Sequence, residues 1–126
     1  MKLHHLGFVL SHPDDISDSI PEKELLHEVI DPIQDARISV YHMGIDCLLE
    51  CIVPLSPQST VYGFLKKNGS GFHHFCYSCS MAEMEAHATK HRLIKVMGPV
   101  LAPVFNNRTV FFYVSRNNRI TEFILD

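Results

Sequence analysis

One pattern occurs twice in this chain, and the repeat restricts its fold more than any other feature of the sequence. Residues 3–8 read Leu-His-His-Leu-Gly-Phe, and residues 72–77 read Phe-His-His-Phe-Cys-Tyr, 69 positions later. An apolar run with a single glutamate follows each copy, and these glutamates, Glu50 and Glu122, are 72 positions apart. Internal similarity of this kind indicates that one structural unit is built twice.

The repeat and the length of 126 residues predict a single domain, 1–126, built from two modules that share one core. Module one covers residues 1–55 and module two covers residues 56–126. Each module is predicted to be β-α-β-β-β, which makes the fold class α+β. We expect the strands of both modules to form a half-open barrel around a central site, with the helices outside.

The boundaries of the expected elements follow from alternating apolar residues in strands and from capping, proline and glycine signals. In module one we expect a strand over 3–10, a helix over 12–28 interrupted at Pro21, and strands over 35–42 and 45–53 joined by a turn at 43–45. In module two we expect a helix from Pro57 to Asn68, a strand over 72–79 and a helix over 81–92. Met81, Met84 and Ala88 of the second helix are expected to face the core. A strand over 93–97, a loop over 98–103 and a hairpin of strands 108–115 and 119–125 follow.

Composition and charge exclude several functional classes. The net charge is −3 and no basic stripe is present, so a nucleic-acid partner is not expected. No apolar run approaches the roughly 20 residues of a membrane span, and the N-terminus does not resemble a signal peptide. The four cysteines lie in apolar, strand-like runs, which predicts reduced and buried thiols in a cytoplasmic protein.

Four residues associated with the repeat form a candidate metal site: His5, Glu50, His74 and Glu122. Each lies in the middle of a predicted strand between apolar neighbours. A charged carboxylate is costly to bury unless it is paired or bound to a metal, so two glutamates in matching positions indicate one shared cause. Two imidazoles and two carboxylates suit one divalent ion such as Zn, Ni, Co, Mn or Fe(II). Alternation alone leaves open the choice between His4 and His5, and between His73 and His74, because both strand faces are apolar.

Two other groups fit a metal site less well. His87 and His91 are four positions apart on a predicted helix that also carries Glu83, but they flank the stripe that faces the core, so a solvated helix face explains them. Cys76 and Cys79 are three positions apart on a predicted strand and would point to opposite faces. Core packing therefore explains these thiols better than a metal knuckle or a redox pair.

At these residues the chain resembles the vicinal-oxygen-chelate superfamily, also called the glyoxalase/bleomycin-resistance fold, and within it the methylmalonyl-CoA epimerases most of all. The stretches that carry the resemblance are His5-Leu6-Gly7, residues 50–55, Ser59-Thr60-Val61 with Phe64-Leu65, residues 71–75, and Asn107-Arg108 through Thr121-Glu122-Phe123. In the family pattern the second histidine of each pair is the ligand. The resemblance therefore implies that His5 and His74 bind the metal together with Glu50 and Glu122.

The resemblance implies a metal-dependent isomerase or epimerase that moves a proton at a carbon next to a carbonyl or thioester. Glu122 is the favoured base and Glu50 its partner, and the expected partners are a small-molecule substrate, such as a CoA or carrier-protein thioester, and a second copy of the chain. The epimerases usually carry Gln at the position of Glu50 and a further carboxylate on the third strand, which residues 36–41 do not offer.

The alternatives are a glyoxalase I-like lyase, a non-catalytic binding protein, and an iron dioxygenase. Glyoxalase I enzymes match the His-Glu-His-Glu set but place an arginine for glutathione in the first strand, where residues 7–9 offer none. A binding protein of the same fold would sequester its ligand without chemistry. A dioxygenase would use only His5, His74 and Glu122 as ligands.

Overall fold

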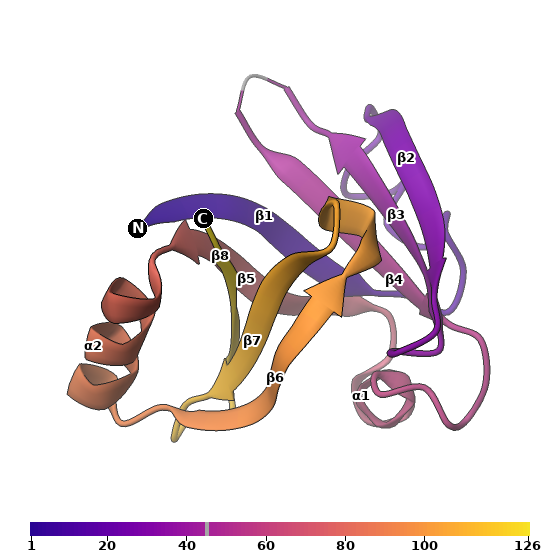
Figure 1. Cartoon of the computed structure of the whole chain (residues 1–126). Helices are drawn as coiled ribbons and strands as arrows, with labels where there is room; N and C mark the ends of the chain where they lie inside the picture. Colours follow the sequence, from indigo (N-terminus) through magenta and orange to yellow (C-terminus); the bar gives the residue numbers. More distant parts are fainter. Residues whose placement is uncertain (45) are drawn as a thin grey trace. The chain divides into compact units, whose positions relative to one another are not determined.

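The computed structural model describes residues 1–44 and 46–126. Its elements in chain order are β1 (Lys2–Val9), β2 (Glu24–Asp31), β3 (Ala36–His42), β4 (Leu48–Pro54), α1 (Tyr62–Asn68), β5 (Gly71–Cys79), α2 (Met81–His91), β6 (Ile94–Ala102), the short 3-10 helix η1 (Pro103–Phe105), β7 (Arg108–Val114) and β8 (Ile120–Leu125) (Figure 1). The order of the hydrogen-bonded strands is β2-β3-β4-β1-β5-β8-β7-β6. No helix within the described residues is long and apolar enough to cross a membrane.

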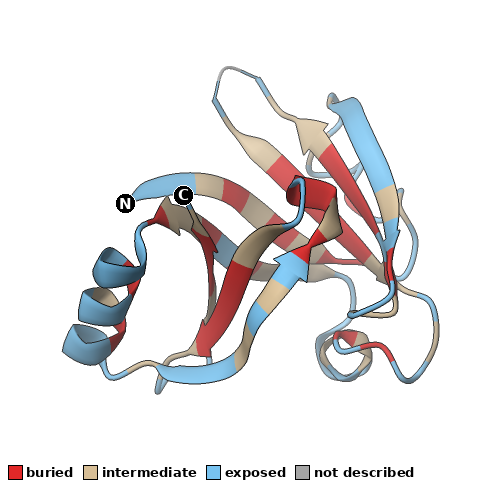
Figure 2. Cartoon of the chain, viewed as in Figure 1, coloured by how far each residue is buried: buried red, intermediate tan, exposed pale blue. Residues whose placement is uncertain are grey.

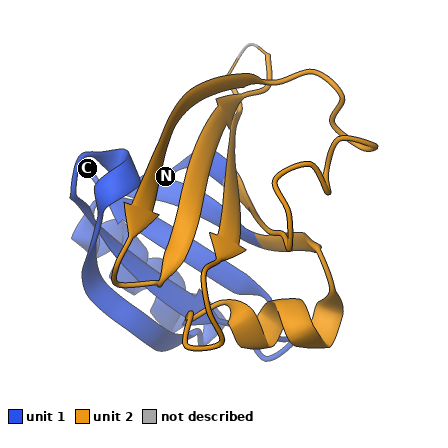
Figure 3. Ribbon diagram, turned by 90° about the vertical axis from the view of Figure 1, so that its right-hand side faces the viewer, with its two compact units in different colours: residues 1–5, 74–126 blue, residues 6–73 orange. Residues whose placement is uncertain are grey.

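The chain divides into two compact units, which are described separately (Figure 3). Unit 1 contains Met1–His5 and His74–Asp126, and unit 2 contains Leu6–His73. The unit boundary falls after His5 and between His73 and His74, so His4, His5 and His74 belong to unit 1 and His73 belongs to unit 2. The predicted modules, 1–55 and 56–126, stay a prediction.

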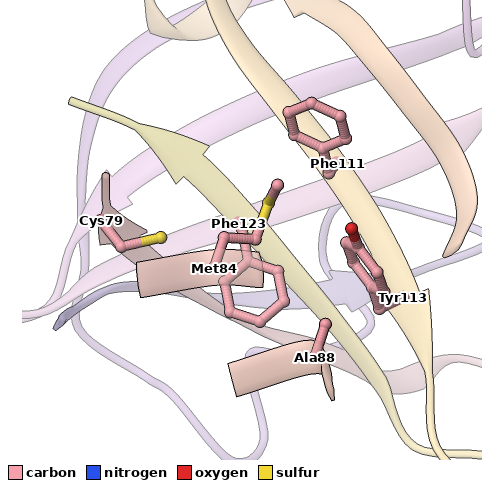
Figure 4. Packing of buried hydrophobic residues seen from close by; sticks show 6 residues of the cluster. All are labelled: Cys79, Met84, Ala88, Phe111, Tyr113 and Phe123. Carbon is pink, nitrogen blue, oxygen red and sulfur yellow. The ribbon is translucent and has the colours of Figure 1, made fainter. Parts of the chain in front are cut away.

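In unit 1, helix α2 covers one face of the sheet formed by β5, β8, β7 and β6 (Figure 1). The helix begins at a capping box, in which the Ser80 side chain accepts a hydrogen bond from the backbone of Glu83 and the Glu83 carboxylate accepts one from the backbone of Ser80. Its buried side chains, Met84 and Ala88, pack on the sheet as predicted. The hydrophobic cluster that they form with the sheet consists of Cys79, Met84, Ala88, Phe111, Tyr113 and Phe123 (Figure 4).

Strand pairing in unit 1 determines which side chains point away from α2. Strand β8 pairs in parallel with β5 and antiparallel with β7, and Glu122 lies opposite Cys76 on one side and opposite Phe112 on the other. Phe123 packs under α2, and successive residues of a strand point to opposite faces. Glu122 therefore points to the face opposite α2.

Unit 2 is built on β2, β3 and β4, which pair antiparallel in sequence order. Its core contains Leu10, Ile16, Leu49 and Cys51, with Phe8, Ile20, Tyr41, Met43 and Val53 packed against them. Figure 2 shows that the buried residues of this unit lie mainly along β3 and β4, while β2 is largely exposed.

The helix predicted over 12–28 is wrong. Residues 13–19 form hydrogen-bonded turns, and residues 24–31 form strand β2. The pairs Leu25/Leu26 and Val29/Ile30 are four positions apart, which imitates helical spacing, whereas the strand is held by backbone pairing with β3 from Glu24 to Asp31. Because β2 ends the sheet and is exposed on both faces, it lacks the alternation that marks a half-buried strand.

Three further boundaries differ from the prediction. Strand β6 continues to Ala102, through all but the last residue of the loop predicted over 98–103, because Gly98 (φ 116°) and Pro99 lie in a bulged part of this edge strand rather than at its end. Helix α1 begins at Tyr62, after turns over residues 57–61. The strand predicted over 45–53 begins at Leu48, and residue 45, the last of the predicted turn, lies outside the described residues.

The two methionines of α2 test the packing of this helix, because both were predicted to face the core. Met84 is 1% exposed, but Met81 is 43% exposed, so the prediction was wrong for Met81. We expect Met84→Ala to lower the free energy of unfolding by about 2–5 kcal/mol, because it leaves a cavity under the helix. The control Met81→Ala should change it by no more than about 0.5 kcal/mol. Urea denaturation measures both values, and equal losses in the two variants would contradict the packing described.

Candidate functional site

Three buried polar side chains meet on the face of unit 1 that lies opposite α2. Nε2 of His74 lies 2.9 Å from Oε2 of Glu122, and Nε2 of His5 lies 3.1 Å from the same oxygen. The two Nε2 atoms are 3.2 Å apart. His5 and His74 are fully buried, and Glu122 is 2% exposed. Strands β1, β5 and β8 each contribute one of the three residues.

The spacing and chemistry of these three atoms form a candidate metal-binding group. Two ligand atoms that each lie about 2.1 Å from one ion are about 3.0 Å apart when they meet it at a right angle and about 3.4 Å apart at the tetrahedral angle. The observed separations of 2.9 to 3.2 Å fall close to this range. Imidazole and carboxylate groups are also ordinary ligands of divalent transition metals. The donor set therefore fits a metal ion.

Aromatic rings hold the two histidines in place. Phe105, from η1, stacks on the His5 ring with a centroid distance of 4.9 Å and an interplanar angle of 21°. Phe112, the neighbour of Glu122 on β7, meets the His74 ring edge-on at 5.6 Å. Burial separates the second histidine of each pair from the first, because His4 and His73 are only partly buried. Alternation in the sequence could not make this distinction.

Glu50, the fourth predicted ligand, lies in unit 2. It occupies the middle of β4 opposite Val40 of β3 and is 3% exposed. The sequence predicted a carboxylate buried in an apolar strand, and Glu50 has that environment. Its membership in a metal site with the residues of unit 1 stays a prediction.

Sequence reasoning missed two groups whose contacts the structure shows. Phe105 follows Pro103 in a stretch that carries no motif, so its contact with His5 had no sequence signal. Glu28 lies on β2, which was read as a helix, so its carboxylate was not considered among those of the sheet. It accepts hydrogen bonds from Ser39 at 2.6 Å and from Arg37 at 2.8 Å, and these two donors lower the pKa of Glu28.

From the sequence, the His87/His91 pair and the cysteines are poor candidates for a metal site. The rings of His87 and His91 lie 4.6 Å apart on α2, and partial burial is the main cause that lowers the pKa of His87. Within the residues described, none of the four cysteines forms a disulfide. Burial raises the pKa of Cys51 to about 12, so this thiol stays protonated and is a poor nucleophile at neutral pH.

No protein-family model matches the chain. The Bacillus subtilis protein YqjC, described as uncharacterized, is 23% identical over 118 residues, which are 91% of this chain and 84% of that protein.

Solved structures cover nearly the whole chain at low identity. A hypothetical protein from Bacillus halodurans has a TM-score of 0.79 at 23% identity and covers 99% of this chain and 94% of its own. The methylmalonyl-CoA epimerase of Mycobacterium tuberculosis has a TM-score of 0.80 at 20% identity, over 98% of this chain and 87% of its own. A variant Streptomyces coelicolor epimerase in complex with 2-nitronate-propionyl-CoA has a TM-score of 0.79 at 17% identity, over 100% of this chain and 94% of its own.

These likenesses confirm the predicted fold class, with one correction. Module one has no helix between β1 and β2, so the first β-α-β-β-β unit is four strands without a helix. The chain has the fold that these methylmalonyl-CoA epimerases have.

Proposed function

We propose that this chain is a metal-dependent isomerase or epimerase that moves a proton at a carbon next to a carbonyl or thioester group. The observation that carries this proposal is the buried cluster of His5, His74 and Glu122, whose three ligand atoms lie within 3.2 Å of one another. A carboxylate that is 2% exposed needs partners that offset its lost hydration, and the two imidazoles together with a bound cation would supply them.

The residues that would hold the metal are His5, His74 and Glu122, with Glu50 as the fourth ligand that the sequence repeat predicts. The ion would be one of Zn, Ni, Co, Mn or Fe(II), because these accept mixed nitrogen and oxygen ligands. When bound, such an ion supplies positive charge that stabilises the negative charge developing on a substrate carbonyl oxygen.

The chain's own carboxylates would move the proton. Glu122 acts as the base that takes the proton from the carbon next to the carbonyl, and it becomes a carboxylic acid in that step. Glu50 would begin the reaction as the carboxylic acid, give its proton to the opposite face of the same carbon, which inverts the configuration, and end as the carboxylate. Phe105 and Phe112 exclude water from the histidines through the contacts described above.

A CoA or carrier-protein thioester is the substrate class that we favour. Support comes from the structural likeness to the Streptomyces coelicolor epimerase, whose complex contains 2-nitronate-propionyl-CoA. The glyoxalase I-like lyase and the non-catalytic binding protein remain the alternatives. The homodimer and the cytoplasmic location stay predictions.

The histidine doublet at residues 73 and 74 provides a matched pair of variants for the metal. His74→Ala should abolish stoichiometric binding of Zn²⁺, because it removes a nitrogen of the ligand cluster. His73→Ala should keep the metal and lose the edge-on packing of its ring on Phe64, at 4.6 Å. Metal analysis after dialysis measures both. Full occupancy in His74→Ala would count against the ligand assignment.

The two glutamates are tested by α-proton exchange with solvent deuterium. Glu122→Gln should lose turnover by roughly 10²–10⁴-fold, because an amide cannot accept a proton near neutral pH. Glu50→Gln should still exchange the proton of one enantiomer but fail with the other if Glu50 is the second base. If Glu50 is only a ligand, that variant stays active with both enantiomers. Mass spectrometry of each enantiomer of a thioester such as methylmalonyl-CoA, incubated in D₂O, gives the readout.

Two outcomes would redirect the proposal. Equal and undiminished exchange of both enantiomers by both variants would end the assignment of the glutamates as bases. Stoichiometric metal with no exchange of any carbonyl acid or thioester tested would favour the binding protein of the same fold.

A further inference from the structure

The ring of His4 makes a close contact with the ring of His5 on the side away from the ligand cluster. Nδ1 of His4 lies 2.8 Å from Nδ1 of His5. Nε2 of His5 faces Glu122 and His74 at 3.1 and 3.2 Å. Two ring nitrogens at hydrogen-bond distance share one proton, which one ring donates and the other accepts. The position of that proton on His5 decides what Nε2 of His5 can do.

Phe105 holds both rings of this pair. It stacks on His5, and its ring meets the ring of His4 edge-on, with a centroid distance of 4.9 Å and an interplanar angle of 87°. Phe105 is 7% exposed, and His5 is fully buried. Rotation of the His5 ring by half a turn, which would put Cδ2 in the place of Nδ1 and Cε1 in the place of Nε2, therefore has to displace a buried aromatic side chain. This arrangement fixes Nδ1 of His5 toward His4 and Nε2 toward the cluster.

A neutral histidine that binds a metal through one ring nitrogen carries its proton on the other. Histidine ligands almost always donate that second N–H to an acceptor, which fixes the tautomer and the orientation of the ring. We propose that His4 is this acceptor and acts as a positioning residue: Nδ1 of His4 accepts the hydrogen bond from Nδ1–H of His5 and so keeps Nε2 of His5 available for the metal. This inference rests on the metal site of the proposed function.

The consequence is a specific tautomer for each ring in the metal-bound protein. His5 carries its proton on Nδ1, and His4 carries its proton on Nε2, because its Nδ1 is the acceptor. In the usual use of such an acceptor a carboxylate or a backbone carbonyl receives the N–H group. Here the imidazole of His4 accepts the N–H group instead. His4 therefore orients the ligand, and His5 binds the metal.

Zinc affinity, measured by competition with a chelator, tests the role of His4. His4→Leu should weaken binding by about 10–100-fold, which is the usual effect of removing such an acceptor. His4→Asn should recover most of the affinity, because Oδ1 of Asn occupies the same position along the side chain as Nδ1 of His. His73→Leu is the matched control from the other doublet, because its ring packs on Phe64, and it should bind zinc as the unmodified chain does.

The variant His5→Ala separates failure of the site from failure of the inference. Unchanged zinc affinity in His5→Ala would overturn the metal site and the inference together. Lost affinity in His5→Ala with unchanged affinity in His4→Leu would overturn the inference alone. Equal losses in His4→Asn and His4→Leu would also overturn it, because then the acceptor atom is not what matters.

A measurement on the unmodified chain keeps the inference testable if a variant fails to fold. In the zinc-loaded protein labelled with ¹⁵N-histidine, NMR shifts of the ring nitrogens report which nitrogen of each ring is protonated. We expect Nδ1–H for His5 and Nε2–H for His4. A proton on Nδ1 of His4 would overturn the assignment, because that nitrogen could then not accept the hydrogen bond.

Discussion

The burial of the Glu122 carboxylate beside two imidazoles is the interaction on which the candidate site depends. A carboxylate that loses its water must regain equivalent interactions within the protein, and Glu122 lies 2.9 and 3.1 Å from two histidine nitrogens. Strand β8 places it there, because β8 pairs with both β5 and β7 and Phe123 anchors the other face under α2. The hydrophobic core under α2 therefore positions Glu122 on the opposite face of β8.

The sequence predicted the buried strands that carry His5, His74 and Glu122 better than it predicted the edges of the sheet, and the reason is physical. His5, His74 and Glu122 lie in paired, buried strands, where apolar neighbours on both sides leave a clear signal. Strands β2 and β6 lie at the two ends of the strand order and expose much of their surface, so their side chains follow no strict alternation. Such strands depend on backbone pairing, which leaves no pattern in the sequence.

Local cues also misled the prediction where tertiary contacts override them. A helix was predicted over 12–28, but in the structure Ile16 packs into the core of unit 2 from a series of turns. The glycine and proline at residues 98 and 99 indicated a loop, yet β6 continues through them as a bulged strand. Alternation between two apolar faces left open which histidine of each doublet is buried; the family resemblance favoured the second, and the structure buries His5 and His74.

The central claim is that nitrogen and oxygen atoms bind the metal. It needs a direct test, because unit 1 contains a second set of potential ligand atoms close to one another. His4, His5 and Cys76 also offer ligand atoms within 4.8 Å of one another, and a site built on them would contain sulfur. X-ray absorption spectroscopy of the zinc-loaded chain distinguishes the two sets most directly. Coordination by two imidazole nitrogens with the remaining ligands oxygen is the result that the account predicts. A sulfur ligand at about 2.3 Å from the zinc would contradict it and place the ion beside Cys76.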